Sequence, residues 1–396
     1  MLKRAVLKKL ESLTMDRLVL VSGDARREYG PGGGLAATVT VKDERFFRRV
    51  ALGGSLGAAD AYVEGLWSTD DLVTALRILL RNLPALRGLD RGGARLLSPF
   101  RRFAHWLNRN TRTGSRKNIA AHYDLGNDLF RLFLDETMAY SAAVFPRPEA
   151  TLEEGQEEKF DRLCRGLALA PEHRLVEIGT GWGGFAVHAA GRYGCRVVTT
   201  TISKEQHDLA VERIRAAGLA DRVEVLLRDY RDLAGRFDRL VSIEMIEAVG
   251  HGFLPAYLGK CADLLVPDGL AAIQAILMRE QDYRRYLASV DFIRARIFPG
   301  STLPALHTIA SAVASATDFR IVHLEDITPH YARTLALWRE RFMARVAEVR
   351  ALGYPEEFVR LWEYYLAFCE AGFTERYIAD QQIYLAKPGW RGEVSP

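Results

Sequence analysis

Residues 174–190 read RLVEIGTGWGGFAVHAA, and this stretch decides the fold of the chain. Leu175, Val176 and Ile178 form a short apolar run of the kind found in buried parallel strands. Four of the next six residues, 179–184, are glycines, and a stretch typical of a helix follows. Glycines let the backbone approach a ligand closely, and a helix N-terminus offers N–H groups to an anion. The stretch predicts the first βα unit of a nucleotide-binding fold, although tight packing of strand against helix also produces such a turn.

The spacing of the glycines bears on the kind of ligand. They read GxGxGG, whereas the dinucleotide fingerprint reads GxGxxG. An acidic residue followed by glycine-x-glycine, here Glu177, Gly179 and Gly181, suits S-adenosylmethionine (SAM) at least as well. The turn alone leaves both ligands open, and the motifs elsewhere in the chain decide between them.

Strand and helix patterns alternate along the middle of the chain. Buried-strand patterns recur at 195–201, 223–227, 237–243 and 269–276, with helical patterns between them. This alternation predicts an α/β fold with a doubly wound, mostly parallel Rossmann-like sheet. Ligands of such sheets bind beyond the carboxyl ends of the strands. The glycine turn and three polar residues fall there: Thr201, Asp229 and Glu247.

Three regions are expected along the chain. Residues 1–85 are predicted to form a small N-terminal α/β domain that associates with lipid. Residues 86–117 are expected to form a basic linker. Residues 118–396 are expected to form the catalytic domain, in which an insertion over 280–325 covers the site as a lid.

The composition is that of a globular protein with enough chain for a sizeable core. Of the 396 residues, 48% are hydrophobic and 26% are charged, which are ordinary values. No apolar run approaches the ~20 residues of a membrane span, and the N-terminus lacks the apolar core of a signal peptide. Scattered cysteines without metal-ligand spacing predict a reduced, cytoplasmic protein with no metal site. They are Cys164, Cys195, Cys261 and Cys369.

Basic residues are concentrated in one stretch. Residues 77–117 hold eleven Lys or Arg and one acid, with leucines and aromatic residues between them. This pattern is typical of a surface for anionic lipid or nucleic acid, and also of a solvated helical linker. A shorter basic amphipathic piece, LKRAVLKKL, occupies residues 2–10. We expect peripheral association with the inner face of the cell membrane and no binding to nucleic acid.

Several separated motifs lie in order along roughly residues 20–390. They include SLGAADAYVEGLW, HYDLGNDLFRLFLDETMAYSAAVF, VEIGTGWGGFA, TISKEQ, SIEMIEAVGH, IFPGSTLP and YARTLALWRERF. Together they resemble the cyclopropane fatty acid synthase family of SAM-dependent methyltransferases. The resemblance implies transfer of a methyl(ene) group from SAM to the cis double bond of unsaturated acyl chains of membrane phospholipids, forming cyclopropane fatty acids. It also favours a homodimer.

The resemblance assigns residues to the cofactor. Tyr140 and Ser141 would contact the amino-acid end of SAM, and Gly179 and Gly181 would pack beneath it. The family also places residues near the ribose and the adenine. These are Thr201, Ile202 and Gln206 for the ribose, and Asp229 and Tyr230 for the adenine.

The resemblance further implies a bicarbonate ion as the proton acceptor. Glu247 and Tyr331 would hold it, and the backbone carbonyl of residue 142 would face it. Gln274 and Ile276, which follow the fifth strand, belong to the same catalytic set. The family usually has Cys where this chain has Ala142 and His where it has Gln274. Glutamine can donate a hydrogen bond to an anion but cannot carry a positive charge, so methyl transfer is more firmly expected than ring closure.

Other interpretations stay open. Without a base near the new methyl group, the product would be a methyl-branched or methylene fatty acid. A methyltransferase of a soluble small molecule, and an inactive lipid-binding relative, are the rival functions. Tyr140 and Tyr331 could be core aromatic residues, and Glu247 an exposed carboxylate. Cys369 stands at a family cysteine position, but the chemistry needs no thiolate, so a small buried helix residue is the favoured interpretation.

Overall fold

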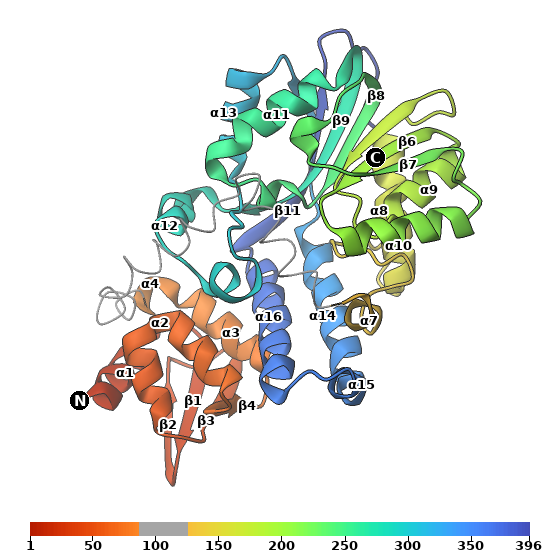
Figure 1. Ribbon diagram of the computed structural model, residues 1–396. Coiled ribbons are helices and arrows are strands. Elements are labelled where there is room, and N and C mark those ends of the chain that lie inside the picture. The colour runs from red at the N-terminus through yellow and green to blue at the C-terminus, as the bar shows by residue number, and fades with distance from the viewer. Residues whose placement is uncertain (87–125) are drawn as a thin grey trace. The chain divides into compact units, whose positions relative to one another are not determined.

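The computed structural model describes residues 1–86 and 126–396, which fall into two compact units (Figure 1). Of the described residues, unit 1 takes 1–86, 284–299 and 335–377, and unit 2 takes the rest. The expected linker and most of the basic stretch lie outside the described residues.

Unit 2 is built on a seven-stranded sheet with the order β10-β11-β9-β8-β5-β6-β7. The strands from β5 to β9 run parallel to their neighbours, whereas β11 is antiparallel to both β9 and β10. The prediction of a doubly wound, mostly parallel Rossmann-like sheet is confirmed. The strands are β5 (Arg174–Ile178), β6 (Arg196–Thr201), β7 (Val223–Leu227), β8 (Phe237–Ile243), β9 (Leu265–Met278), β10 (Arg320–Asp326) and β11 (Ile378–Ala386).

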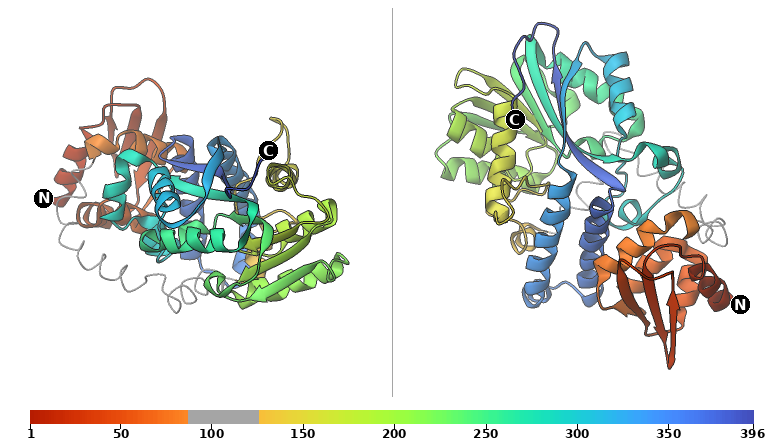
Figure 2. Two further views of the ribbon diagram at one scale, coloured as in Figure 1. Left: turned by 90° about the horizontal axis from the view of Figure 1, so that it is seen from above. Right: turned by 180° about the vertical axis from the view of Figure 1, so that it is seen from behind.

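Helices cover both faces of this sheet (Figures 1 and 2). Alternate residues of β5 enter different cores, since Val176 and Ile178 pack with α11 and α13 while Leu175 packs with α8 and α9. Helix α8 begins with a capping box formed by Thr151 and Glu154. The helices of unit 2 are α7 (Asn127–Arg131), α8 (Leu152–Gly166), α9 (Gly184–Tyr193), α10 (Lys204–Ala216), α11 (Leu254–Asp263) and α13 (Leu306–Ala316).

The expected lid over 280–325 has a different arrangement in the structure. Residues 284–299 belong to unit 1, whereas α13 and β10 continue the α/β alternation of unit 2. Strand β10 reads RIVHLED and lies at the sheet edge, where Ile321, Val322 and Leu324 are exposed. Because an edge strand mixes charges with exposed apolar residues, its sequence lacks the buried pattern that marks the central strands.

Unit 1 contains a four-stranded sheet with the order β2-β1-β3-β4. Strand β1 pairs antiparallel with β2 and parallel with β3. The strands are β1 (Arg17–Ser22), β2 (Ala25–Tyr29), β3 (Ala36–Val41) and β4 (Trp67–Thr69). The helices are α1 (Leu2–Leu10), α2 (Arg45–Val63), α3 (Leu72–Arg81), α4 (Leu83–Leu86), α15 (Val346–Ala351) and α16 (Glu356–Thr374), with α12 (Tyr283–Leu287) and α14 (Thr328–Ala344) at its boundaries with unit 2.

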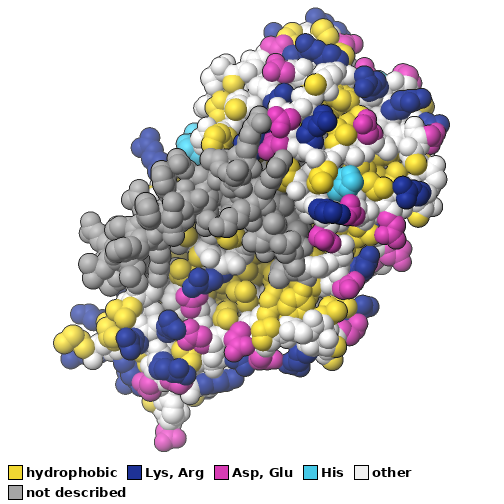
Figure 3. All heavy atoms as spheres, in the orientation of Figure 1, with side chains coloured by type: hydrophobic (Ala, Val, Ile, Leu, Met, Phe, Trp, Pro, Cys, Tyr) yellow, Lys and Arg dark blue, Asp and Glu magenta, His cyan; other side chains and the backbone are white. Residues whose placement is uncertain are grey.

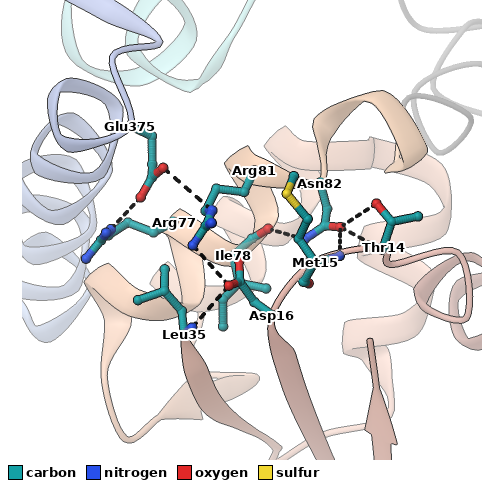
Figure 4. Close-up of polar contacts among 9 residues, drawn as sticks. All are labelled: Thr14, Met15, Asp16, Leu35, Arg77, Ile78, Arg81, Asn82 and Glu375. Carbon is teal, nitrogen blue, oxygen red and sulfur yellow. Dashed lines mark hydrogen bonds and ion pairs between the residues drawn. The ribbon is translucent and has the colours of Figure 1, made fainter. Parts of the chain in front are cut away.

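Helix α16 is fixed within unit 1 by polar contacts at its C-terminal end (Figure 4). Arg77 of α3 donates to Glu375 over 2.7 Å, and Arg81 lies 3.8 Å from the same carboxylate. Arg81 also donates to the buried Asp16 over 3.0 Å. The side chain of Asn82 accepts hydrogen bonds from the backbone before β1. The expected catalytic domain therefore loses 335–377 to unit 1, because the sequence shows that α16 has an apolar face but not which partner covers it.

Candidate functional site

The glycine turn after β5 has the backbone that its sequence requires. Gly179, Gly181 and Gly183 have φ values of 104°, 51° and 85°, a region that residues with a Cβ rarely adopt. The N–H groups of Gly179 and Thr180 both donate to the carbonyl of Thr200, each over 3.0 Å. A Cβ added at Gly181 would meet no atom within 4 Å, so there is open space beside the turn. The turn therefore fits the close approach of a ligand such as SAM.

Glu177 lies one residue before the end of β5, and its carboxylate is buried. The hydroxyl of Thr199 on the neighbouring strand β6 donates to it over 2.6 Å. Burial raises the pKa of Glu177 to about 8, while the bond from Thr199 and attraction to Lys159 act in the opposite direction. Glu177 thus forms part of the support beneath the turn.

The end of β6 is organised by Thr201. Its hydroxyl donates to the side-chain oxygen of Gln206 over 2.8 Å and accepts from the N–H of Ser203 over 3.1 Å. Ser203 caps helix α10 by accepting from the N–H of Gln206. Ile202 lies between these polar residues. The expected ribose residues are therefore brought together by short-range contacts.

The end of β7 carries an ion pair. Arg231 donates through Nε and Nη2 to the two carboxylate oxygens of Asp229, over 2.8 and 2.7 Å. Such a bidentate pair is rigid. The ring of Tyr230 packs edge-on against Tyr257, with centroids 5.3 Å apart. We call the residues that support the turn and the ends of β6 and β7 the cofactor edge: Glu177, Gly179, Gly181, Thr199, Thr201, Ile202, Gln206, Asp229, Tyr230 and Arg231.

The Tyr140-Ser141-Ala142 segment is held by helix α8. The ammonium group of Lys159 donates to the hydroxyl of Ser141 over 2.7 Å, and Gln156 donates to the carbonyl of Ser141 over 2.9 Å. Tyr140 is half-buried, and its ring packs edge-on against Phe130 at 5.2 Å. Lys159 is fully buried, and burial lowers its pKa to about 8 against the attraction of nearby carboxylates.

Glu244 follows directly after β8, and its carboxylate accepts hydrogen bonds from three parts of the chain. The N–H of Ala142 donates to Oε1 over 2.7 Å, and Nε2 of Gln274 donates to the same oxygen over 2.8 Å. The hydroxyl of Tyr331 donates to Oε2 over 2.7 Å. Glu244 has a φ of 47°, an uncommon conformation for a residue with a Cβ. The sequence interpretation did not single out this residue.

Two further carboxyl groups lie around Glu244. Oε1 of Glu247 accepts from the N–H of Ile276 over 2.6 Å, while Oε2 is buried without a hydrogen-bond partner among the described residues. Asp380 on β11 accepts from Nε2 of Gln274 over 3.2 Å. We call Glu244, Glu247 and Asp380 the acid cluster.

Burial dominates the electrostatics of the acid cluster. Burial, then repulsion from Glu244, raises the pKa of Glu247 to about 8. Burial raises the pKa of Asp380 well above its usual range, with repulsion from both glutamates adding to it. The pKa of Glu244 is also raised by burial, but hydrogen bonds from Tyr331 and Ala142 and attraction to Lys159 oppose the change. Glu244 is therefore the member whose negative charge is best supported.

Most of the expected catalytic set converges in unit 2. The side chains or backbone of Ala142, Gln274 and Tyr331 meet at Glu244, and Ile276 meets Glu247. Their target differs from the expectation, since the donors assigned to bicarbonate are engaged by the Glu244 carboxylate. These residues therefore do not fit a bound bicarbonate ion as they stand.

Cys369 is the exception in the expected catalytic set. It lies on α16 in unit 1, not in unit 2 with the others. Burial raises the pKa of its thiol well above the ordinary value, so the reactive thiolate is disfavoured. This supports its interpretation as a structural helix residue.

The sequence interpretation missed Lys159, Glu244 and Asp380. Glu244 stands three residues before Glu247, so a second acid at a strand end was a visible signal. Lys159 is the basic residue between acids and apolar residues in EEKFDRL, and Asp380 lies in the last strand, IADQQIYLA. Both residues are notable because they are charged and buried. The sequence does not show which single charged residue will be buried.

Comparison with known proteins gives a consistent result. Residues 110–383 match the family model described as mycolic acid cyclopropane synthetase. The chain is 41% identical to tuberculostearic acid methyltransferase of Mycobacterium tuberculosis over 349 residues, which are 86% of this chain and 81% of that one. It is 35% identical to cyclopropane-fatty-acyl-phospholipid synthase of Escherichia coli over 358 residues, 90% of this chain and 89% of that one. The cyclopropane synthase MmaA2 structure from M. tuberculosis has a TM-score of 0.65 at 33% identity, covering 69% of this chain and 98% of that one. A structure of the mycolic acid cyclopropane synthase CmaA1 complexed with SAH and CTAB has a TM-score of 0.64 at 33% identity, with the same coverage.

Proposed function

The chain belongs to the mycolic acid cyclopropane synthetase family of SAM-dependent C-methyltransferases, and from this premise we propose that it methylates a cis double bond in an unsaturated fatty acyl chain. One observation carries the proposal: a turn suited to SAM follows β5, and Glu244 and Glu247 of the acid cluster follow the adjacent strand β8. A Cβ added at Gly179 would lie 3.2 Å from Cγ of Met245, so the two loops are in close proximity. Methyl transfer followed by proton loss needs a methyl donor and a proton acceptor side by side.

The protein's part in this reaction is orientation and charge. SAM supplies the electrophilic methyl group, on a sulfonium that the cofactor edge would hold. The alkene attacks that methyl group, and a carbocation forms on the acyl chain. The half-buried ring of Tyr140 could stabilise a cation by roughly 1–2 kcal/mol. No residue of the chain needs to act as a nucleophile.

The product follows from the fate of the carbocation. Loss of a proton from the transferred methyl group gives cyclopropane when the ring closes. After a hydride shift, loss of a proton from the same methyl group gives a methylene branch, so this product also needs a base there, unlike the expectation from the sequence. A saturated methyl branch needs a hydride donor in addition, so it is not proposed for this chain alone. We place the methylene branch first, because the relative at 41% identity is named a tuberculostearic acid methyltransferase, and the expected cyclopropane second, because the relative at 35% identity is named a cyclopropane synthase.

The acyl chain is proposed to be carried by a phospholipid at an anionic membrane surface. Helix α1 supports this, since its basic residues Lys3, Arg4 and Lys8 are exposed while Val6, Leu7 and Leu10 are buried. Binding through such a helix would be electrostatic and weakened by salt. On the face drawn in Figure 3, basic and acidic side chains are interspersed. No helix within residues 1–86 and 126–396 meets the length and hydropathy needed to cross a bilayer.

A homodimer is also proposed. The family resemblance favours it, and the exposed apolar residues of β10 lie at a free sheet edge, which is a surface that proteins commonly cover. Light scattering coupled to gel filtration tests it, and a monomer at micromolar concentration would contradict it.

The test of the proposed function uses the full chain and SAM labelled with ¹³C in the methyl group. Vesicles of dioleoyl phosphatidylglycerol provide the double bond, and free oleate and oleoyl thioester form parallel arms. Proton and carbon NMR of the extracted lipid should show the vinylic signals of a labelled methylene branch. Upfield cyclopropane signals would place the ring product first. Label found only in free oleate or in the thioester would exclude the phospholipid as the substrate. Absence of label from every acyl chain would overturn the proposal.

A further inference from the structure

The carboxylate of Glu244 accepts hydrogen bonds from residues that the family resemblance places around a bicarbonate ion. Gln274 and Tyr331 donate to it through their side chains, over 2.8 and 2.7 Å. The N–H of Ala142, at the family's cysteine position, donates over 2.7 Å. Three donors from three separate segments of the chain thus converge on one half-buried side chain.

Shape and charge make this substitution chemically sensible. A carboxylate and a bicarbonate ion are both planar anions with two equivalent oxygens on one carbon, and the same donors suit both. Glu244 is attached to the chain, so its carboxylate is present without capture from solution. Its position directly after β8 also puts it beside the glycine turn, through Met245.

We propose that the carboxylate of Glu244 is the proton acceptor of this enzyme, and that the enzyme works without bicarbonate. The inference rests on the proposed function, since it names the base for the same methyl transfer. Electron pairs balance as follows. The alkene pair forms a C–C bond to the methyl carbon of SAM, and the C–S pair stays on sulfur. A C–H bond of that methyl group then breaks and its proton goes to Glu244. Its electron pair neutralises the carbocation, either as the C–C bond that closes a ring or, after a 1,2-hydride shift to the neighbouring cation, as the π bond of a C=CH₂ group.

Glu244 is a better acceptor than its neighbour Glu247. Since the pKa of Glu247 is about 8, that carboxyl holds a proton at neutral pH and cannot take another. Burial raises the pKa of Glu244, and the hydrogen bonds from its donors and the charge of Lys159 oppose that rise. A base of this kind gains from taking a proton, because protonation removes a buried charge. The proton returns to water after the product leaves.

The first experiment asks whether the full-length enzyme needs bicarbonate. Methylation of dioleoyl phosphatidylglycerol vesicles is measured in buffer stripped of carbon dioxide under argon, with and without added sodium bicarbonate. The added concentration is about 10 mM, which is high enough to occupy a site that binds an anion weakly. The expected rates agree within about twofold. A rate that falls tenfold or more on stripping, and recovers with bicarbonate, would overturn the inference and leave the proposed function intact.

The second experiment uses two variants of Glu244. Glu244→Gln keeps the shape but cannot accept a proton, and should lose at least ~100-fold in product formation, the usual contribution of a general base. Glu244→Gly removes the side chain at a position whose φ of 47° suits glycine. It should be equally slow in stripped buffer and recover at least tenfold with bicarbonate or formate, because the three donors then face the space that the carboxylate occupied. Glu244→Gln should not recover.

Two controls separate folding from chemistry. Glu224→Gln changes an exposed carboxylate on β7 and should keep the full rate. Binding of S-adenosylhomocysteine to both Glu244 variants, measured by calorimetry, should stay within about threefold of the parent enzyme. An unchanged rate in Glu244→Gln would overturn the inference, and so would failure of both anions to restore a Glu244→Gly variant that still binds the nucleoside. If neither variant folds, the bicarbonate experiment alone decides. Absence of methylation by the parent enzyme in both buffers would instead count against the proposed function.

Discussion

The cofactor edge and the acid cluster belong to one sheet, but their carboxylates differ in the hydrogen-bond partners available to them. At the cofactor edge each carboxylate has a dedicated partner close by, Thr199 for Glu177 and Arg231 for Asp229. In the acid cluster three carboxyl groups share a few donors, and one oxygen of Glu247 has none among the described residues. A buried polar group without a partner is costly, so it persists where function requires it.

The difference indicates a division of labour within unit 2. Paired groups hold their geometry, which suits binding of a polar cofactor. Crowded carboxyl groups with raised pKa values exchange protons readily, which suits chemistry. Variants at the two places should therefore fail in different ways, and the following predictions run from the largest expected effect to the smallest.

The largest effect is expected from removing Lys159, the buried cation beside the acid cluster. Lys159→Met leaves the carboxylates without a compensating charge, and loss of one partner from a buried ionic group costs about 3–5 kcal/mol of unfolding free energy. Urea denaturation at pH 8 measures the loss. The loss of unfolding free energy should shrink at pH 6, because Glu177, with a pKa of about 8 and an attraction to Lys159, is then protonated.

The matched control for this prediction is Lys204→Met. Lys204 lies on the surface of α10 and pairs with Asp208 four residues on. Exposed pairs of this type contribute little to the free energy of unfolding, because solvent screens them. Equal destabilisation by the two variants would show that Lys159 has no special electrostatic role.

The second prediction concerns the pH dependence of stability. The pKa of Glu247 rises to about 8 from an ordinary 4.5. Between these values the folded state holds a proton that the unfolded chain has lost, so stability falls as pH rises through this window and is level above it. One pKa unit corresponds to about 1.4 kcal/mol, so the non-titrating variant Glu247→Gln should gain about 4 kcal/mol relative to the parent between pH 5 and pH 8.

Urea titrations at four pH values between 5 and 8 measure this difference. Glu177 has the same raised pKa and should leave a residual slope in the variant. Glu224→Gln changes an exposed residue of β7, so its free energy of unfolding should depend on pH as that of the parent enzyme does. Parallel curves for Glu247→Gln would mean that Glu247 is ionised throughout, and the contrast between the two places would weaken.

The cofactor edge was largely predictable because its contacts are short-range. Thr201 and Gln206 lie five residues apart, and the glycine turn is contiguous. Strand periodicity likewise predicts the central sheet, since buried parallel strands are apolar throughout. The edge strand β10 was not predicted because its exposed residues lack the apolar pattern of a buried strand. The place of α16 in unit 1 was not predicted because an amphipathic pattern does not show which partner covers the apolar face.

The acid cluster was predictable only in part, since its contacts join distant segments. Ala142 and Glu244 are 102 residues apart, and Gln274 and Asp380 are 106 apart. The family resemblance supplied Gln274 and Ala142 as members of the set but assigned them to bicarbonate. What they bind here depends on Glu244, a residue whose role emerges only when the fold brings the three donors to it.

The smallest predicted effect lies at the cofactor edge. Asp229→Asn removes the charge from the pair with Arg231, and one charge-assisted hydrogen bond is worth about 1.5 kcal/mol. The binding of S-adenosylhomocysteine should weaken about tenfold in calorimetry, while the rate at saturating SAM stays within about twofold, because this edge binds and does not exchange protons. Asp221→Asn, an exposed neighbour before β7, should change neither quantity. A lower rate at saturating SAM with unchanged binding would break the contrast, since the paired edge would then contribute to the chemical step that the acid cluster is proposed to perform.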